Sequence, residues 1–428
     1  MFKTKKVISL ISIISLFTTL NAKDITLKEL IDLSIQNNSN IKISQHKEET
    51  KKANLITSKA AYLPKLSAKG ELARYDIKSS GSSVDDNVTS LSLTANQLIY
   101  DFGKTSSNIK SAKKDLEASA FETITNITST VLKTKQAYYS ILNNYQQINL
   151  AQESIKIDKL HLNQANSYYE AGVRTLIDVT DAKLKLSNSK LKLVQSKYSL
   201  KNSKTKLISI LGIDNISDLN IKSDMHIEDI VNNLNPKENN LNKLIENGYK
   251  NRSELKMYNE QILSQKLKLK STNKEYYPKL DFDASYSDKN SDEITSIDSR
   301  QTTAGIYLKW DFYTGGTTKA NIKSSLASLN TLKQQRVQEK LQIKEDITSA
   351  YFKVKENQES INIARLNVKL ATQKLDLANQ RYEAGLNDLV EVSDSKLQYT
   401  QSKSDLVNTY YNYLDSKASL DYATGIIY

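Results

Sequence analysis

An acidic segment that occurs twice is the part of the sequence best placed to do chemistry. Tyr-Glu-Ala-Gly stands at 169–172 and again at 382–385, and an acid follows each glycine by six residues. Another acid comes three residues later, which gives the pairs Asp178 with Asp181 and Glu391 with Asp394. Residues three apart share one face of a helix, and paired carboxylates could act as general acid and base. The dipole at a helix start also favours acids, so a purely structural role stays open.

The rest of the composition does not support catalysis. The chain has no cysteine and only three histidines, at 46, 161 and 226, so no thiolate site, histidine metal site or nucleophile–base pair is indicated. The segment TGGTTK at 314–319 lacks the spacing of a phosphate-binding loop. The net charge is +12, but lysines and acids are interspersed, which does not favour nucleic acid. We expect no enzyme, cofactor, metal or nucleic-acid partner, and a hydrolase is the weakest hypothesis.

The first 22 residues predict export. Three lysines at positions 3, 5 and 6 precede an apolar run from Val7 to Leu20, which is typical of a secretory signal peptide cleaved after Ala22. A retained membrane anchor is the alternative. Because the chain has no cysteine, the mature N-terminus could not carry a lipid on that residue.

The acidic segments belong to a long internal duplication. Residues 103–213 align with 316–426 without a gap, at a constant offset of 213. Between Gly103 and Gly212 there is no proline and only one glycine, Gly172, and between Gly316 and Gly425 the same holds for Gly385. Glycine and proline are the main helix breakers, so each block predicts a long helix, an elbow and a second long helix. At about 1.5 Å per residue the first helix would be roughly 100 Å long, so each elbow should be the tip of an antiparallel coiled-coil hairpin.

Alternating segments precede each hairpin. Leu280, Phe282, Ala284 and Tyr286 alternate with polar residues, and a period of two predicts strands with one apolar face. Polar loops are expected at 78–86 and 287–299. Four strands cannot close a membrane barrel, which needs at least about eight, and open edges are not viable in lipid. A membrane barrel would therefore have to be shared by several chains, whereas a soluble antiparallel sheet remains the alternative.

The predicted organisation is a signal peptide and two repeats. The first repeat covers 23–213, a linker covers 214–240, and the second repeat covers 241–428. The fold class is mainly α with membrane β. The expected elements are helices at 26–61 and 241–276, strands at 64–76, 89–102, 278–287 and 302–313, and helical hairpins at 103–212 and 316–424.

This doubled plan resembles the outer-membrane efflux protein family of TolC-like outer membrane factors. The resemblance rests on Pro64 and Pro278 at the strand starts, on the junctions at 100–103 and 310–312, and on the two elbows. It implies a homotrimer with a shared β-barrel in outer-membrane lipid and an α-helical tunnel in the periplasm. It also implies an exit duct for a tripartite efflux pump or type I secretion system, served by a periplasmic adaptor and an inner-membrane transporter.

The resemblance also assigns roles near the elbows. Tyr382 matches a gate tyrosine, Asp178 matches the acid that receives gate bonds, and Glu391 and Asp394 match a ring of acids around the opening. Asn387 stands where the family has a gate arginine, and Arg174 occupies the equivalent place in the first repeat. The complete gate set is Arg174, Asp178, Asp181, Tyr382, Glu391 and Asp394. The expected adaptor contacts are Ala171, Gly172, Val173, Ala384, Gly385 and Leu386.

A ring of three carboxylates would favour cations in a narrow pore. The runner-up function is a periplasmic adaptor or another coiled-coil scaffold, since adaptors also use long helical hairpins. The cargo, whether drugs, metal ions or secreted proteins, is left open by the sequence.

Overall fold

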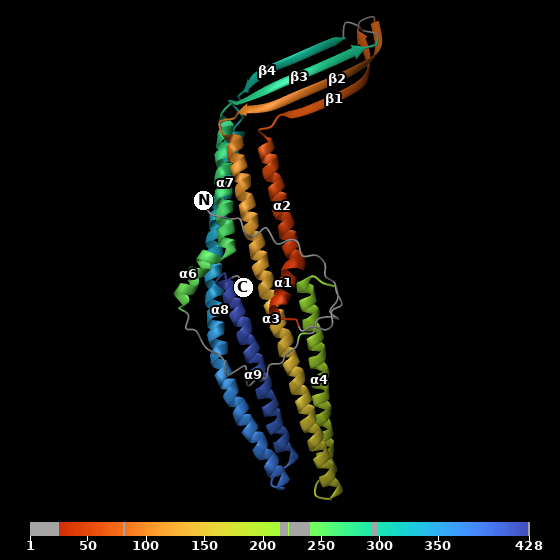
Figure 1. Cartoon of the computed structure of the whole chain (residues 1–428), viewed down its shortest axis with the longest axis vertical. Coiled ribbons are helices and arrows are strands. Elements are labelled where there is room, and N and C mark those ends of the chain that lie inside the picture. The colour runs from red at the N-terminus through yellow and green to blue at the C-terminus, as the bar shows by residue number, and fades with distance from the viewer. Residues whose placement is uncertain (1–24, 80–81, 215–220, 222–239, 293–297, 427–428) are drawn as a thin grey trace.

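Two helical hairpins extend from one end of a four-stranded sheet (Figure 1). The computed structural model describes residues 25–79, 82–214, 221, 240–292 and 298–426. The predicted signal peptide and nearly all of the predicted linker at 214–240 lie outside these residues.

The order of elements is the same in both repeats. The first repeat contains α1 (Leu27–Asn37), α2 (Ser39–Ala60), β1 (Lys65–Ser79), β2 (Ser82–Tyr100), α3 (Lys104–Glu170) and α4 (Leu176–Leu211). The second contains α6 (Leu241–Asn251), α7 (Ser253–Asn273), the 3-10 turn η1 (Lys274–Tyr276), β3 (Lys279–Ser291), β4 (Ser299–Lys309), α8 (Thr317–Glu383) and α9 (Leu389–Ala423). The fold class expected from the sequence, mainly α with one small sheet, is confirmed.

The long helices α3 and α8 each run for 67 residues because nothing in their sequence breaks them. They stop at Gly172 and Gly385, whose φ angles of 71° and 74° lie in the left-handed region that favours glycine. Along their length, α3 packs on α4 and on α9, and α8 packs on α9, so the helices follow the order α4–α3–α9–α8. Ile141, Ile361 and Val407 form the core where the two hairpins meet.

The sheet joins the two repeats. Its order is β1-β2-β3-β4, every pair is antiparallel, and β2 pairs with β3 in a register that sets Ala95 opposite Ala284. One face carries apolar side chains that are exposed in the single chain, among them Leu66 at 78%, Leu72 at 79% and Ile306 at 63%. The opposite face is polar, as the alternation of the strands requires.

At the ends away from the helices all four strands extend beyond the expected bounds, whereas β4 ends at Lys309, short of the expected end at 313. The polar loops expected at 78–86 and 287–299 are partly wrong, because β1 and β2 continue to Ser79 and Ser82 and β3 continues to Ser291. The ladder is a backbone property and does not need apolar side chains. Near these ends a salt bridge between Arg74 and Asp85, 2.8 Å long, crosses from β1 to β2.

Across the described residues, no helix has an apolar stretch long enough to cross a membrane.

Candidate functional site

The two hairpin tips lie side by side at the end of the molecule farthest from the sheet (Figure 1). All six residues expected to contact an adaptor are exposed there. The exposed fraction is 68% for Val173 and 70% for Leu386. Each tip thus presents an exposed apolar side chain directly after its glycine.

Arg174 ties the first tip to the second. Its Nη2 donates a 2.5 Å hydrogen bond to the main-chain oxygen of Asn387, and its guanidinium lies 5.3 Å from the centre of the Tyr382 ring. Tyr168 contacts the same ring edge-on, with 5.6 Å between the ring centres. The structure therefore brings together Asn387, which stands where the resemblance expects an arginine, and Arg174, at the equivalent place in the first repeat.

Tyr382 is buried at this contact, with 2% of its surface exposed. Burial raises the pKa of its phenol, and the nearby charge of Asp178 adds to the rise, whereas Arg174 opposes it. Within the described part of the chain its hydroxyl has no hydrogen-bond partner. The bond from this tyrosine to Asp178 that the resemblance implies is thus not made within the single chain.

Of the four acids of the predicted gate, Asp178 and Glu391 lie in the first turns of α4 and α9, and Asp181 and Asp394 follow one turn later. Asp178 closes a capping box at the start of α4, where its Oδ2 accepts from the backbone N–H and the hydroxyl of Thr175, both at 3.0 Å. Glu391 lies 3.7 Å from Arg381 in an exposed pair. Asp181 and Asp394 are exposed. The structural role at a helix start is thus realised for Asp178, and the other three carboxylates face solvent in the single chain.

Sequence reasoning missed a buried charge pair farther up the hairpins. Lys396 of α9 donates to Asp158 Oδ2 of α3 at 2.8 Å and to Ser189 Oγ of α4 at 3.2 Å. Ser189 Oγ also donates to Asp158 Oδ2. The side chains of Lys396 and Asp158 are only 11% and 3% exposed. Three helices from both hairpins therefore meet at one ion pair.

The sequence did contain a signal for this pair. Buried positions of α3 follow a three-four spacing through Ala151, Ser154, Asp158, His161 and Ala165, so an aspartate and a histidine occupy the apolar seam of a coiled coil. A charged residue in such a seam indicates a partner on the facing helix. Burial lowers the pKa of His161, and the charge of Asp158 partly offsets this.

Nothing at the tips or the seam indicates a metal site. Among the residues that the structure describes, no group of three or more histidines or acids is placed to hold a metal ion.

Solved structures share this architecture. The structure of CusC, described as a transmembrane channel, matches with a TM-score of 0.81 at 14% identity over 94% of this chain and 92% of that one. The Campylobacter jejuni CmeC outer membrane channel matches with a TM-score of 0.81 at 16% identity, covering 93% of this chain and 85% of that chain. The fold, with its doubled hairpins and shared sheet, is that of an outer-membrane channel.

The family follows from the sequence. The model of the outer membrane efflux proteins matches residues 30–213 and 244–426, so both repeats are covered and the chain belongs to that family. Outer membrane protein TolC of Escherichia coli K12 is 21% identical over 357 residues, which are 80% of this chain and 71% of TolC. Outer membrane protein TolC of Salmonella enteritidis is 21% identical over 356 residues, 80% of this chain and 70% of that protein.

Family and fold agree on function at this level. The chain is an outer-membrane exit duct for efflux, and its long helical part extends into the periplasm. No comparison favours the periplasmic adaptor or scaffold considered from the sequence.

Proposed function

We propose that three copies of the chain form one duct of a tripartite efflux pump or type I secretion system, passive and without catalytic activity of its own. The observation that carries this proposal is the pair of open edges on the sheet. With the order β1-β2-β3-β4, the outer edges of β1 and β4 have no partner strand within the described chain. Open edges are not tolerated in lipid, and pairing β4 with β1 of the next copy would remove them. Three copies would give twelve strands, within the known range of membrane barrels.

Two apolar stripes support the same assembly. On α4 the exposed side chains recur every seven residues, at Ile177, Leu184, Leu191 and Tyr198. On α8 they recur at Ile363, Leu370 and Leu377. These helices are the two outer members of the order α4–α3–α9–α8, so α8 of one copy can pack on α4 of the next. A seven-residue repeat is the spacing of a coiled-coil seam.

The oligomer is tested with a pair of neighbouring substitutions on α4. Leu191→Glu puts a charge in the stripe, whereas Lys190→Glu changes the charge of an exposed residue beside it. We expect the mass of the detergent-solubilised particle to fall from three chains to one for Leu191→Glu only. A trimer that persists in Leu191→Glu would count against this interface.

The tips are proposed as the periplasmic gate. Arg174 and Tyr382 would hold the two hairpins of one copy together, and threefold symmetry would turn Glu391 and Asp394 into rings of carboxylates. Rings of acids favour cations. Replacing both acids by alanine should lower the cation selectivity of the channel in planar bilayers, whereas Asp405→Ala, an exposed acid elsewhere on α9, should not. Equal selectivity in both variants would remove the acids from the gate.

The tips are also proposed as the adaptor contact. The bare side chains of Val173 and Leu386 are suited to a helical hairpin of an adaptor, because an exposed apolar group gains most from being covered. The adaptor would connect the duct to an inner-membrane transporter. Photo-crosslinkers at these two positions should capture the adaptor in cells, and crosslinkers at Lys190 should not. Capture at Lys190 alone would place the contact on the hairpin shaft instead.

A further inference from the structure

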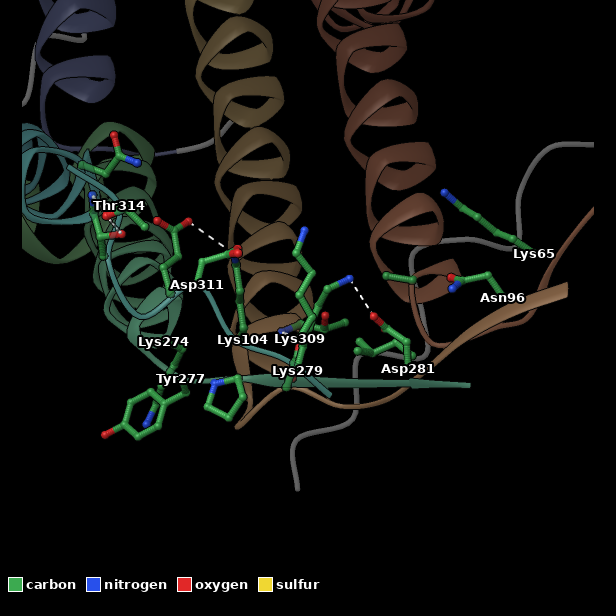
Figure 2. Close-up of a pocket in the computed structure, with 18 of the residues that line it drawn as sticks. Lys65, Asn96, Lys104, Lys274, Tyr277, Lys279, Asp281, Lys309, Asp311 and Thr314 are labelled. Atoms are coloured by element: carbon green, nitrogen blue, oxygen red, sulfur yellow. Dashed lines mark hydrogen bonds and ion pairs between the residues drawn. The ribbon is translucent and has the colours of Figure 1, made fainter. Parts of the chain in front are cut away.

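A lysine-rich cavity lies where the sheet meets the ends of the helices (Figure 2). Its volume is about 560 Å³, and all four strands together with the ends of α2, α3, α8 and η1 contribute to its wall. Five lysines line it: Lys65, Lys104, Lys274, Lys279 and Lys309. They come from five different elements, so the tertiary structure collects them.

The acids of the cavity neutralise only part of this charge. Lys279 pairs with Asp281 at 2.7 Å, and Lys104 pairs with Glu275 at 3.3 Å. Asp101 is buried and accepts hydrogen bonds from two backbone N–H groups, those of Gly103 and Thr105.

The other three lysines lack such a partner. Lys274 lies over the ring of Tyr277, with 4.6 Å to its centre. For Lys65 and Lys309, the side chains that the structure describes provide no ion pair, and the remaining acid, Asp311, is exposed. The cavity therefore keeps an excess of positive charge.

Two of the lysines are direct neighbours across strands. In the register of β3 and β4, Lys279 stands opposite Lys309, and like charges directly opposite destabilise a sheet. Both lysines lie on the polar face, and so does Lys65, whose partner Asn96 stands opposite Asp283. In Figure 2 the side chains of Lys279 and Lys309 extend toward the space between the ends of α2 and α3, whereas Lys65 lies on the other side of α2. A bound anion at Lys279 and Lys309 would relieve the repulsion.

The two junctions between strand and helix are capped by different residues. Asp101 caps the start of α3, and the residue 213 positions later is Thr314. Thr314 Oγ1 accepts from the N–H of Thr318 at 3.3 Å, and the first turn of α8 has no acid. The start of α8 is thus capped by a neutral hydroxyl, and the acid of this junction, Asp311, is exposed.

We propose that this cavity binds an oxyanion, a phosphate or carboxylate group, at Lys279 and Lys309, which stand directly opposite each other on β3 and β4. Charge-assisted hydrogen bonds from ammonium groups to such oxygens are the strong ones in proteins. The inference rests on the proposed function in one respect: the polar face of the sheet lines the duct, so the ligand is an anionic solute that passes through it. The headgroup phosphate of a lipid is the other source of the same chemistry.

The test uses pyrophosphate as the probe and the purified full chain in uncharged detergent. We expect titration calorimetry to detect binding that weakens about tenfold for Lys279→Gln and about tenfold for Lys309→Gln. Lys309→Arg should retain most of the affinity because it keeps the charge. Lys289→Gln is the control, since Lys289 lies on the same strand as Lys279 but does not line the cavity. Circular dichroism of the helices identifies any variant that fails to fold. The binding comparison is then made among the remaining single substitutions.

The outcomes distinguish a failure of the proposed anion site from a failure of the proposed channel function. Absent binding, or equal binding in Lys309→Gln and Lys289→Gln, overturns the site. In planar bilayers of neutral lipid, pyrophosphate should reduce the current of the wild type more than that of Lys309→Gln. Lysine-dependent binding in a chain that forms no channel would refute the duct and retain the site. A third outcome concerns lipid: anionic phospholipid could co-purify with the wild type, be absent from Lys309→Gln and be displaced by pyrophosphate. That result would assign the bound phosphate to a lipid headgroup and overturn the proposal that the ligand is a solute.

Discussion

Breaking the buried pair between Asp158 and Lys396 should loosen the two hairpins from each other. Asp158→Asn keeps the shape of the side chain but leaves the Lys396 ammonium without its carboxylate. Removing one partner of a buried ion pair costs about 3–5 kcal/mol. Because only 11% of Lys396 and 3% of Asp158 is exposed, solvent screening should reduce this cost little. We expect the free energy of unfolding to fall by an amount in that range.

The same two helices provide a matched control. Glu153 of α3 and Lys403 of α9 form a pair of almost the same length, 2.9 Å, but are 40% and 25% exposed. Exposed pairs contribute about 0–1 kcal/mol, so Glu153→Gln should cost far less than Asp158→Asn. The two costs differ because of burial, since the helices and the distance are nearly shared.

The assay is guanidinium unfolding in uncharged detergent, followed by helical circular dichroism, on a double-mutant cycle. Lys396→Met should cost about as much as Asp158→Asn, because it leaves the carboxylate buried. The double variant should recover most of the loss, since no unpaired charge remains. If the two single costs simply add, or if Glu153→Gln costs as much as Asp158→Asn, the reasoning from burial is wrong.

Three further outcomes are expected. Burial lowers the pKa of His161, so as the pH falls the unfolded chain binds the proton before the folded chain does. The free energy of unfolding should therefore be level above the ordinary histidine pKa of about 6.5 and fall as the pH drops below it. A pH series in which His161→Gln shows the same fall would contradict this. Tyr382→Phe should leave the melting temperature unchanged or raise it, because the buried hydroxyl has no partner in the described chain and its removal ends a desolvation cost; a clear loss of stability would reveal a bond made by the hydroxyl in the assembled duct. Gly385→Ala should lower the free energy of unfolding by about 1 kcal/mol, because the φ of this residue is 74°. Nothing within 4 Å would touch a Cβ, so the loss comes from backbone strain alone. Thermal unfolding measures the loss, and no loss would mean that the turn relaxes.

Much of the fold was accessible from the sequence because its causes are local. Helices end where Gly172 and Gly385 allow a left-handed turn, and the absence of other breakers sets the length of α3 and α8. The alternation through Phe282 and Ala284 marked the strands. The ends of the strands were missed, because ladder hydrogen bonds continue past the last apolar residue.

The candidate site, too, could be predicted from the sequence only in part. The elbows, their acids and the unusual positions of Arg174 and Asn387 could be read from the duplication. That Arg174 reaches Asn387 across the tips could not, because 213 residues separate them and only the packing of α3 on α9 brings the hairpins together.

The sequence by itself determined the repeats, the hairpins and their exposed tips, since each depends on residues a few positions apart. Tertiary structure alone decided which charges are buried together and which remain unpaired. Asp158 meets Lys396 238 residues later in the chain, and lysines from five elements gather at the junction of sheet and helices. Long-range electrostatics depends on distance in space, and a linear sequence does not contain that distance.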